Sequence, residues 1–123
     1  MKSLLTAAAI TLILSSSVSA FESGVRIACR DSVSGYKYDI KIVDIGDEEA
    51  YVRITRPGQS NQFYPSNKVV FDESDKGATF ELLNNQGATV EGLFVDYSIE
   101  NADNGESYYY DGGDSRAIEC FLK

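Results

Sequence analysis

Beyond its first twenty residues, the chain alternates apolar and polar side chains in short segments, and this period of two restricts the fold more than any other feature. In the clearest segment, 36–42, the apolar members are Tyr36, Tyr38, Ile40 and Ile42. Successive side chains of a strand point to opposite faces, so each segment is expected to be a strand with one buried face. The same period recurs at 25–29, 50–54, 78–82, 89–99 and 116–122, and the apolar run 69–71 is expected to be a short strand. No helical period follows residue 20, and the sequence therefore predicts an all-β fold.

Two cysteines stand near the ends of this alternating region, Cys29 in the first predicted strand and Cys120 in the last. In an oxidising compartment two cysteines most simply form one disulfide, and their wide spacing does not resemble that of a redox pair. Such a bridge makes the first and last strands neighbours, as the closure of a meander into a barrel requires. We therefore predict an all-β, small antiparallel barrel of seven or eight strands closed by one disulfide, with a β-sandwich as the alternative.

Two glycines carry specific structural expectations. Gly77 follows Ser-Asp-Lys in a predicted turn, where it is expected to take a left-handed conformation. Gly92 interrupts the longest alternating segment, whose apolar phase changes between Val90 and Leu93. A β-bulge or a close approach of another group to the backbone is expected at Gly92.

Residues 1–20 have the pattern of a cleaved signal peptide. Lys2 precedes an apolar run of roughly 11 residues, much shorter than the ~20 needed to span a membrane. Val18 and Ala20 fit the positions before a signal-peptidase cut at Phe21. We expect residues 21–123 to form a single β domain in the periplasm or outside the cell, with no membrane span.

The composition excludes several classes of function. With no His in the chain, neither a Ser-His nor a Cys-His catalytic pair is possible, and a Cys/His zinc site is excluded as well. Residues 21–123 carry 10 basic and 19 acidic side chains, because Lys2 is the eleventh basic residue, so their net charge is 10 − 19 = −9. This charge disfavours nucleic acid and favours a cationic protein partner. The acidic clusters match no calcium-binding loop and are expected to be solvated turns, without metal or cofactor.

A tyrosine triplet is the strongest candidate for a partner-binding site. It lies in the polar segment 100–115, whose Tyr, Asn, Ser and Gly content is typical of adaptable recognition loops. The candidate contact residues are Tyr108, Tyr109, Tyr110, Asp111, Asp103 and Glu106. Alternatively, residues 107–111 form a strand with Tyr108 and Tyr110 on one face and Tyr109 on the other. Phe63-Tyr64-Pro65 is either a second contact patch or a plug over one end of the barrel.

The positions of Cys29 and Cys120 resemble those in the small periplasmic inhibitors of C-type lysozyme, which are antiparallel barrels whose disulfide joins the chain ends. That family has a Ser-Gly-x-x-Tyr motif, and Ser34-Gly35-Tyr36-Lys37-Tyr38 matches it. In the family the motif lies mid-chain on a loop that meets the enzyme, whereas here it directly follows the first predicted strand. Its companion motif ends in Lys-Gly, and Asp75-Lys76-Gly77 lacks the preceding Tyr. The resemblance implies an inhibitor, without assigning a role to any residue.

These observations predict a secreted or periplasmic, non-enzymatic protein-binding module, with an inhibitor of a basic hydrolase such as a lysozyme as its most concrete form. The alternative is a carrier that holds a small apolar ligand inside the barrel. An enzyme using paired carboxylates is disfavoured, because a single domain of about 103 residues with these loops offers little cleft.

Overall fold

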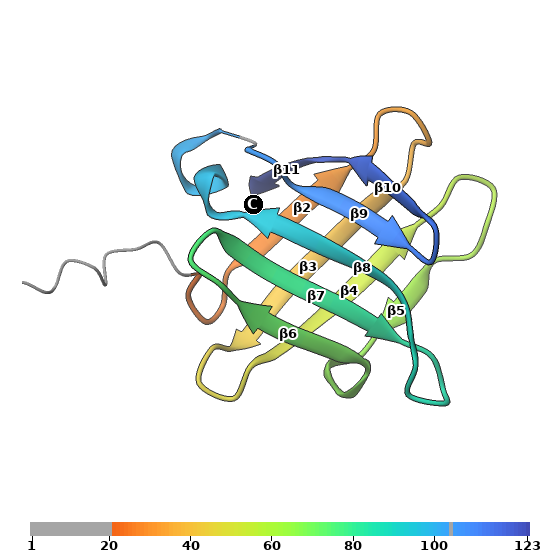
Figure 1. Cartoon of the computed structure of the whole chain (residues 1–123), viewed down its shortest axis with the longest axis horizontal. Helices are drawn as coiled ribbons and strands as arrows, with labels where there is room; N and C mark the ends of the chain where they lie inside the picture. Colours follow the sequence, from red (N-terminus) through yellow and green to blue (C-terminus); the bar gives the residue numbers. More distant parts are fainter. Residues whose placement is uncertain (1–20, 104) are drawn as a thin grey trace, which may run out of the picture.

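A computed structural model describes residues 21–103 and 105–123, so the predicted signal peptide lies outside the described residues. The described residues form ten strands and two 3₁₀ helices (Figure 1). In chain order they are β2 (Arg26–Arg30), β3 (Lys37–Asp44), β4 (Glu49–Thr55), β5 (Gln62–Tyr64), η1 (Ser66–Lys68), β6 (Val69–Glu73), β7 (Gly77–Leu83), β8 (Thr89–Asp96), η2 (Tyr97–Asn101), β9 (Tyr108–Asp111), β10 (Asp114–Ala117) and β11 (Glu119–Leu122). The predicted all-β fold is confirmed.

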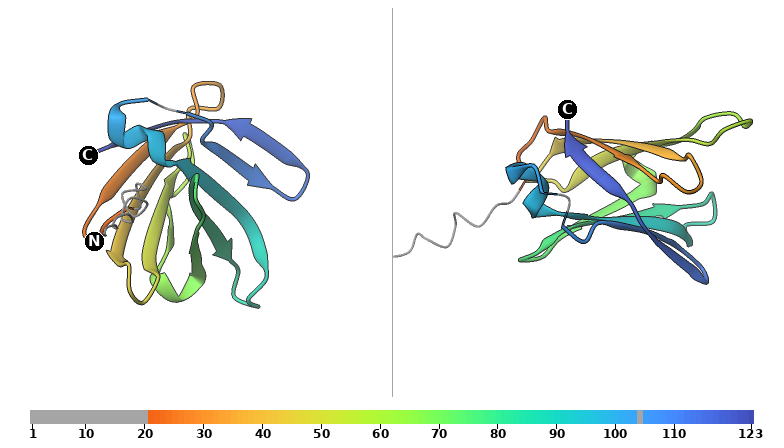
Figure 2. Two further views of the ribbon diagram at one scale, coloured as in Figure 1. Left: turned by 60° about the vertical axis from the view of Figure 1, so that its left-hand side comes forward. Right: turned by 90° about the horizontal axis from the view of Figure 1, so that it is seen from above.

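The strands pair into two antiparallel five-stranded sheets, which lie face to face (Figure 2). The first sheet has the order β11-β2-β3-β4-β5, and the second has the order β10-β9-β8-β7-β6. The first and last strands, β2 and β11, are neighbours as predicted. The pairings of the described strands define two sheets and do not join them into a closed barrel.

One bent stretch of chain connects the sheets at one side. β10 pairs with β9 in the second sheet and β11 pairs with β2 in the first, with only Ile118 between them. The backbone N–H of Ile118 donates to the carbonyl oxygen of Ser107 (3.2 Å), which anchors the corner. At the other side, η1 connects β5 to β6.

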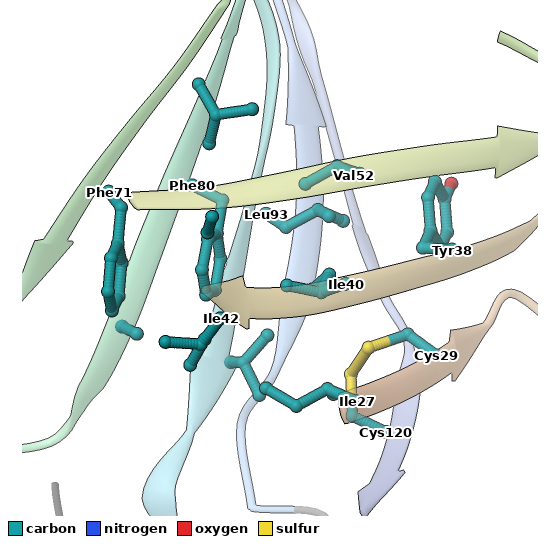
Figure 3. Close-up of a cluster of buried hydrophobic side chains, with 14 of the residues drawn as sticks. Ile27, Cys29, Tyr38, Ile40, Ile42, Val52, Phe71, Phe80, Leu93 and Cys120 are labelled. Carbon is teal, nitrogen blue, oxygen red and sulfur yellow. A yellow bond between two sulfur atoms is a disulfide. The ribbon is translucent and has the colours of Figure 1, made fainter. Parts of the chain in front are cut away.

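The core lies between the sheets and consists of the side chains that the alternating pattern places inward (Figure 3). Tyr38, Ile40 and Ile42 are buried as predicted, whereas Tyr36 precedes β3 and is only partly buried against the core. The rings of Phe71 and Phe80, from paired strands of the second sheet, are stacked with centroids 5.0 Å apart. Burial of this continuous apolar layer is the main force holding the sheets together.

Cys29 and Cys120 form the predicted disulfide. The two residues face each other directly in the β2–β11 pair, with Cα atoms 4.0 Å apart, and both are buried (Figure 3). The bridge therefore fixes the last strand of the chain to the first strand from within the core.

The expectation for Gly77 is wrong. Gly77 is the first residue of β7 and its φ is not positive. Glycine is needed there for space, because a Cβ would collide with the backbone carbonyl of Val95 and the ring of Phe94. The predicted close approach at Gly92 is confirmed, because the ring of Tyr110 fills the place of a side chain.

The longest alternating segment also ends earlier than its pattern suggests. β8 stops at Asp96, and Tyr97–Asn101 forms η2. The Asp96 carboxylate caps η2 by accepting a hydrogen bond from the Ser98 backbone N–H (2.9 Å). Asp is a favourable N-cap because its oxygen accepts a helix N–H that otherwise lacks a partner. Among residues 21–103 and 105–123, no helix has the length and apolarity of a membrane span.

Candidate partner-binding surface

The tyrosine triplet lies in a strand, the alternative that the sequence left open. Residues 108–111 form β9, between β8 and β10. The strand directs Tyr108 outward, with 39% of its surface exposed, and Tyr109 inward, with 3% exposed. Tyr110 is half-buried on the same outer face as Tyr108. Two of the three predicted tyrosines therefore remain available to a partner.

The outward rings form an aromatic strip across the second sheet. Phe94 on β8 stacks on Tyr108 with centroids 5.3 Å apart, and Tyr108 contacts Tyr110 with centroids 5.9 Å apart. Gly92 makes room for the third ring, because any side chain there would collide with Tyr110. Burial, with the nearby Glu81 and Tyr108, raises the pKa of Tyr110, so its phenol stays neutral at ordinary pH.

Acidic side chains surround a hollow at the Phe94 end of this strip. The hollow is lined by Asp75, Lys76, Phe94, Asp96, Asp103 and Glu106, together with η2 backbone and side-chain atoms. Asp103 and Glu106 are exposed. The sequence-predicted acids thus lie beside the aromatic strip, and we call the set Phe94, Tyr108, Tyr110, Asp75, Asp96, Asp103 and Glu106 the acidic–aromatic surface.

Asp96 shapes this hollow. Its two carboxylate oxygens accept hydrogen bonds from the backbone N–H groups of Ser98 (2.9 Å) and Glu106 (3.0 Å). Burial alone would raise the pKa of Asp96, but these hydrogen bonds and the charge of Lys76 hold it below the usual range. Asp96 is therefore ionised and engaged by its own loop, whereas Asp103 and Glu106 lie exposed at the rim.

Asp111 lies apart from this set. It is at the opposite end of β9 from Tyr108, and its carboxylate is 3.4 Å from the Tyr109 hydroxyl. Within the predicted site, Tyr108, Tyr110, Asp103 and Glu106 share one surface, whereas Tyr109 belongs to the core.

A buried polar network, absent from the sequence prediction, occupies the space between the sheets near Tyr109. The Glu91 carboxylate accepts hydrogen bonds from Arg56 (2.6 Å), Tyr64 (2.5 Å) and Tyr109 (2.7 Å). Burial and the neighbouring carboxylate raise the pKa of both tyrosines. Tyr64 thus faces inward, while Phe63 is exposed.

A second ion pair extends this network. Arg116 donates to the buried carboxylate of Asp31 (2.6 Å) and lies over the Tyr109 ring, 4.7 Å from its centroid. Tyr109 also stacks on Tyr38, with centroids 5.4 Å apart. Burial raises the pKa of Tyr38 to about 12, and its hydroxyl has no hydrogen-bond partner among the described residues. Because the charges are paired, we assign the network a structural role.

The alternating pattern could not have predicted that the Glu91 side chain points into the core. The alternation assigned Val90 to the apolar phase before Gly92, but Val90 is exposed and Glu91 points inward with Leu93 and Val95. Partners distant in the sequence make this inward charge favourable: an ion pair with Arg56, 35 positions away, and hydrogen bonds from Tyr64 and Tyr109.

In the described part of the chain, no three His, Cys, Asp or Glu side chains are placed to hold a metal ion. The Ser34-Gly35-Tyr36 residues lie in the β2–β3 loop, where Asp31 accepts a hydrogen bond from the Ser34 N–H (3.3 Å) and Gly35 has a φ of 79°. They are not part of the acidic–aromatic surface.

Comparison with known proteins gives no relative. No family model matches the chain, and neither a curated protein nor a solved structure does. The geometry of the surface and the chemistry of its residues therefore carry the functional argument.

Proposed function

We propose that this chain is a secreted or periplasmic, non-enzymatic binding module that holds a cationic protein partner on the acidic–aromatic surface. The observation that carries the proposal is the meeting of Asp103 and Glu106 with the Phe94–Tyr108–Tyr110 strip on one outer face. In its most concrete form, the partner is a basic hydrolase that the module inhibits.

The surface combines two contributions to binding. Tyrosine rings supply large, rigid contact area with a polar tip, which is why they are frequent in protein interfaces. The acidic hollow beside them can receive a Lys or Arg side chain of the partner, and the net charge of −9 on residues 21–123 attracts a basic protein at long range.

The disulfide supports the proposed location. A buried Cys29–Cys120 bridge persists in an oxidising compartment, such as the periplasm or the extracellular space. The alternative function, a carrier of small apolar ligands, gains no support from the space between the sheets, which is occupied by packed side chains.

The test measures binding and inhibition with a panel of purified basic hydrolases that includes a C-type lysozyme. Tyr108→Ser with Tyr110→Ser should raise the dissociation constant about 100-fold, since two central aromatic contacts are each worth about 1–2 kcal/mol. Asp103→Asn with Glu106→Gln should mainly slow association and reduce its dependence on salt.

A matched control removes the same charge elsewhere. Asp47→Asn with Glu48→Gln changes two exposed acids of the β3–β4 turn and should leave the association rate nearly unchanged. Equal losses in the control and in the Asp103/Glu106 variant would contradict a localised site. Binding to none of the hydrolases would remove the inhibitor form of the proposal.

A further inference from the structure

The outer face of the first sheet, opposite the acidic–aromatic surface, concentrates the positive charge of the molecule. Of the ten basic residues in 21–123, six project from this face. They are Arg26, Arg30, Lys37, Lys41, Arg53 and Lys123. A chain with a net charge of −9 over these residues has therefore gathered most of its cations on one side of one sheet.

The pairing register places like charges directly opposite each other. Arg26 faces Lys41, and Arg30 faces Lys37, in the β2–β3 pair. Cross-strand pairs of like charge destabilise a sheet. Arg30 is relieved by an ion pair with Glu119 (3.0 Å), but neither Arg26 nor Lys41 has an ion-pair partner among the described residues. An arrangement that disfavours the free protein points to an anion that would relieve it.

A hollow lies where these unpaired cations meet. Its side chains include Arg26, Asp39, Lys41, Tyr51, Arg53 and Lys123. The register places Arg26, Lys41 and Tyr51 in one row across β2, β3 and β4. Asp39 is already paired with Lys123 (3.3 Å), so the side chains around the hollow carry a net charge of three positive.

We propose that this hollow binds the phosphate group of a small phosphomonoester. The guanidinium groups of Arg26 and Arg53 and the ammonium group of Lys41 suit a dianionic oxyanion better than a single carboxylate, because each guanidinium donates two parallel hydrogen bonds to phosphate oxygens. Tyr51 lies at the β4 side, in contact with Phe63 (centroids 5.4 Å apart), and provides an aromatic surface for the organic part of the ligand.

The surroundings of the hollow favour a small ligand over a long polyanion. Asp39 and Glu119 interrupt the positive face, and the acidic remainder of the molecule repels an extended chain of phosphates. Within a Debye length of about 8 Å at physiological salt, only the local cations act strongly on a single phosphate group.

The experiment titrates the isotope-labelled protein, purified from cells that express the full chain, with inorganic phosphate and then with phenyl phosphate. Ionic strength is held constant with sodium chloride, and backbone amide shifts are followed by NMR. The amides of Arg26, Asp39, Lys41 and Tyr51 should shift in a saturable way. Phenyl phosphate should bind more tightly than phosphate, and Tyr51→Ser should abolish that difference.

Charge variants locate the site. Lys41→Gln should raise the dissociation constant of phosphate about fivefold, the worth of one exposed charge contact, whereas Lys68→Gln, outside the hollow, should leave it unchanged. Asp39→Asn should lower the constant, a gain that misfolding cannot mimic. Equal weakening by Lys41→Gln and Lys68→Gln, or shifts spread evenly over all cations, would overturn the proposal.

A further arm separates the phosphate site from a membrane-binding face. Vesicles of phosphatidylglycerol and phosphatidylcholine are compared with vesicles of phosphatidylcholine alone. Retention on the anionic vesicles without saturable binding of either soluble phosphate would overturn the small-ligand site in favour of a lipid surface. Saturable phosphate binding with no retention on either vesicle supports the proposal.

Discussion

At the scale of single residues, buried charges are held by specific partners. Asp31 has only 1% of its surface exposed and accepts hydrogen bonds from Arg116 and from the backbone N–H groups of Val33 and Ser34. Burial alone would raise the pKa of Asp31, but these bonds outweigh it and lower the pKa to about 2. A carboxyl group whose pKa falls on folding stabilises the protein above its unfolded pKa.

This shift predicts how stability depends on pH. Asp31 should contribute about 2 kcal/mol to the free energy of unfolding above about pH 5, and this contribution should disappear as the pH falls toward 2. Denaturant unfolding at a series of pH values measures the change. Asp31→Asn should lower stability at pH 7 and flatten the acid limb. An unchanged acid limb in that variant would show that other carboxyls cause it.

Truncation of the side chain should destabilise the protein strongly at Tyr109 and only slightly at Tyr108, because the strand buries the first ring and exposes the second. Tyr109→Ala should cost about 3–5 kcal/mol, as expected for loss of a buried ring. Tyr109→Phe removes only the hydroxyl bonded to Glu91 and should cost about 1–2 kcal/mol. Denaturant midpoints measure these costs. Tyr108→Ala is the control, and a cost equal to that of Tyr109→Ala would contradict the assigned faces.

The backbone nitrogen of Phe21 gives a test of the predicted cleavage site. The Phe21 backbone nitrogen lies 3.3 Å from Glu73 Oε2, which also accepts from the Tyr97 hydroxyl (2.7 Å). If the signal peptide is cut before Phe21, this nitrogen becomes an ammonium group and the contact becomes an ion pair. Glu73→Gln should then destabilise a chain that begins at Phe21 by about 1–2 kcal/mol. In a chain that begins at Ala20 the loss should be smaller, and equal losses would argue against the ion pair.

At the scale of elements, the alternation of apolar and polar side chains predicts the longer strands, because one face of each strand packs on the core. β3 shows this, with Tyr38, Ile40 and Ile42 all buried. The pattern is weaker for β9 and β10, because residues 100–115 are mostly polar and residues 116–122 alternate as if they formed one strand. The structure forms β9 over 108–111 and divides 114–122 into β10 and β11 at Ile118. The pairing of β9 with β8 and of β10 with β9 decides their conformation, and the local pattern carries no record of those partners.

The disulfide should matter most for β11, a short strand at the edge of the first sheet. Closing a loop that spans 91 positions stabilises the fold by at most about 4–5 kcal/mol in the chain-entropy account. Cys29→Ser combined with Cys120→Ser should therefore lower the free energy of unfolding by several kcal/mol, up to about 4–5 kcal/mol. Amide exchange of β11 should accelerate more than that of β3. An unchanged denaturant midpoint would contradict a stabilising role for the bridge.

At the scale of the whole molecule, the two outer faces carry opposite chemistry. Sequence composition predicted a cationic partner from the net charge, but it could not show that six basic residues share one face. Such segregation depends on which strands pair and in what register, as when Arg26 meets Lys41. Asp103 and Glu106 lie close to the tyrosines in the sequence, so they could be predicted to share a surface with them. Phe94 and Asp75 join that surface only through strand pairing, so the sequence could not predict their place there.

A substitution at Ile118 tests whether the two sheets unfold as one unit. It lies at the corner between β10 and β11, with 2% of its surface exposed, and packs in the core shared by both sheets. Ile118→Ala should therefore destabilise the protein by about 2–4 kcal/mol. Because one core supports both sheets, amide-exchange protection in β3 and β8 should fall by similar free energies.

Val33→Ala, at a position 90% exposed in a loop, is the matched control and should change neither the stability nor the amide-exchange protection. Loss of protection in only one sheet would show that the sheets are separate cooperative units joined by the corner alone.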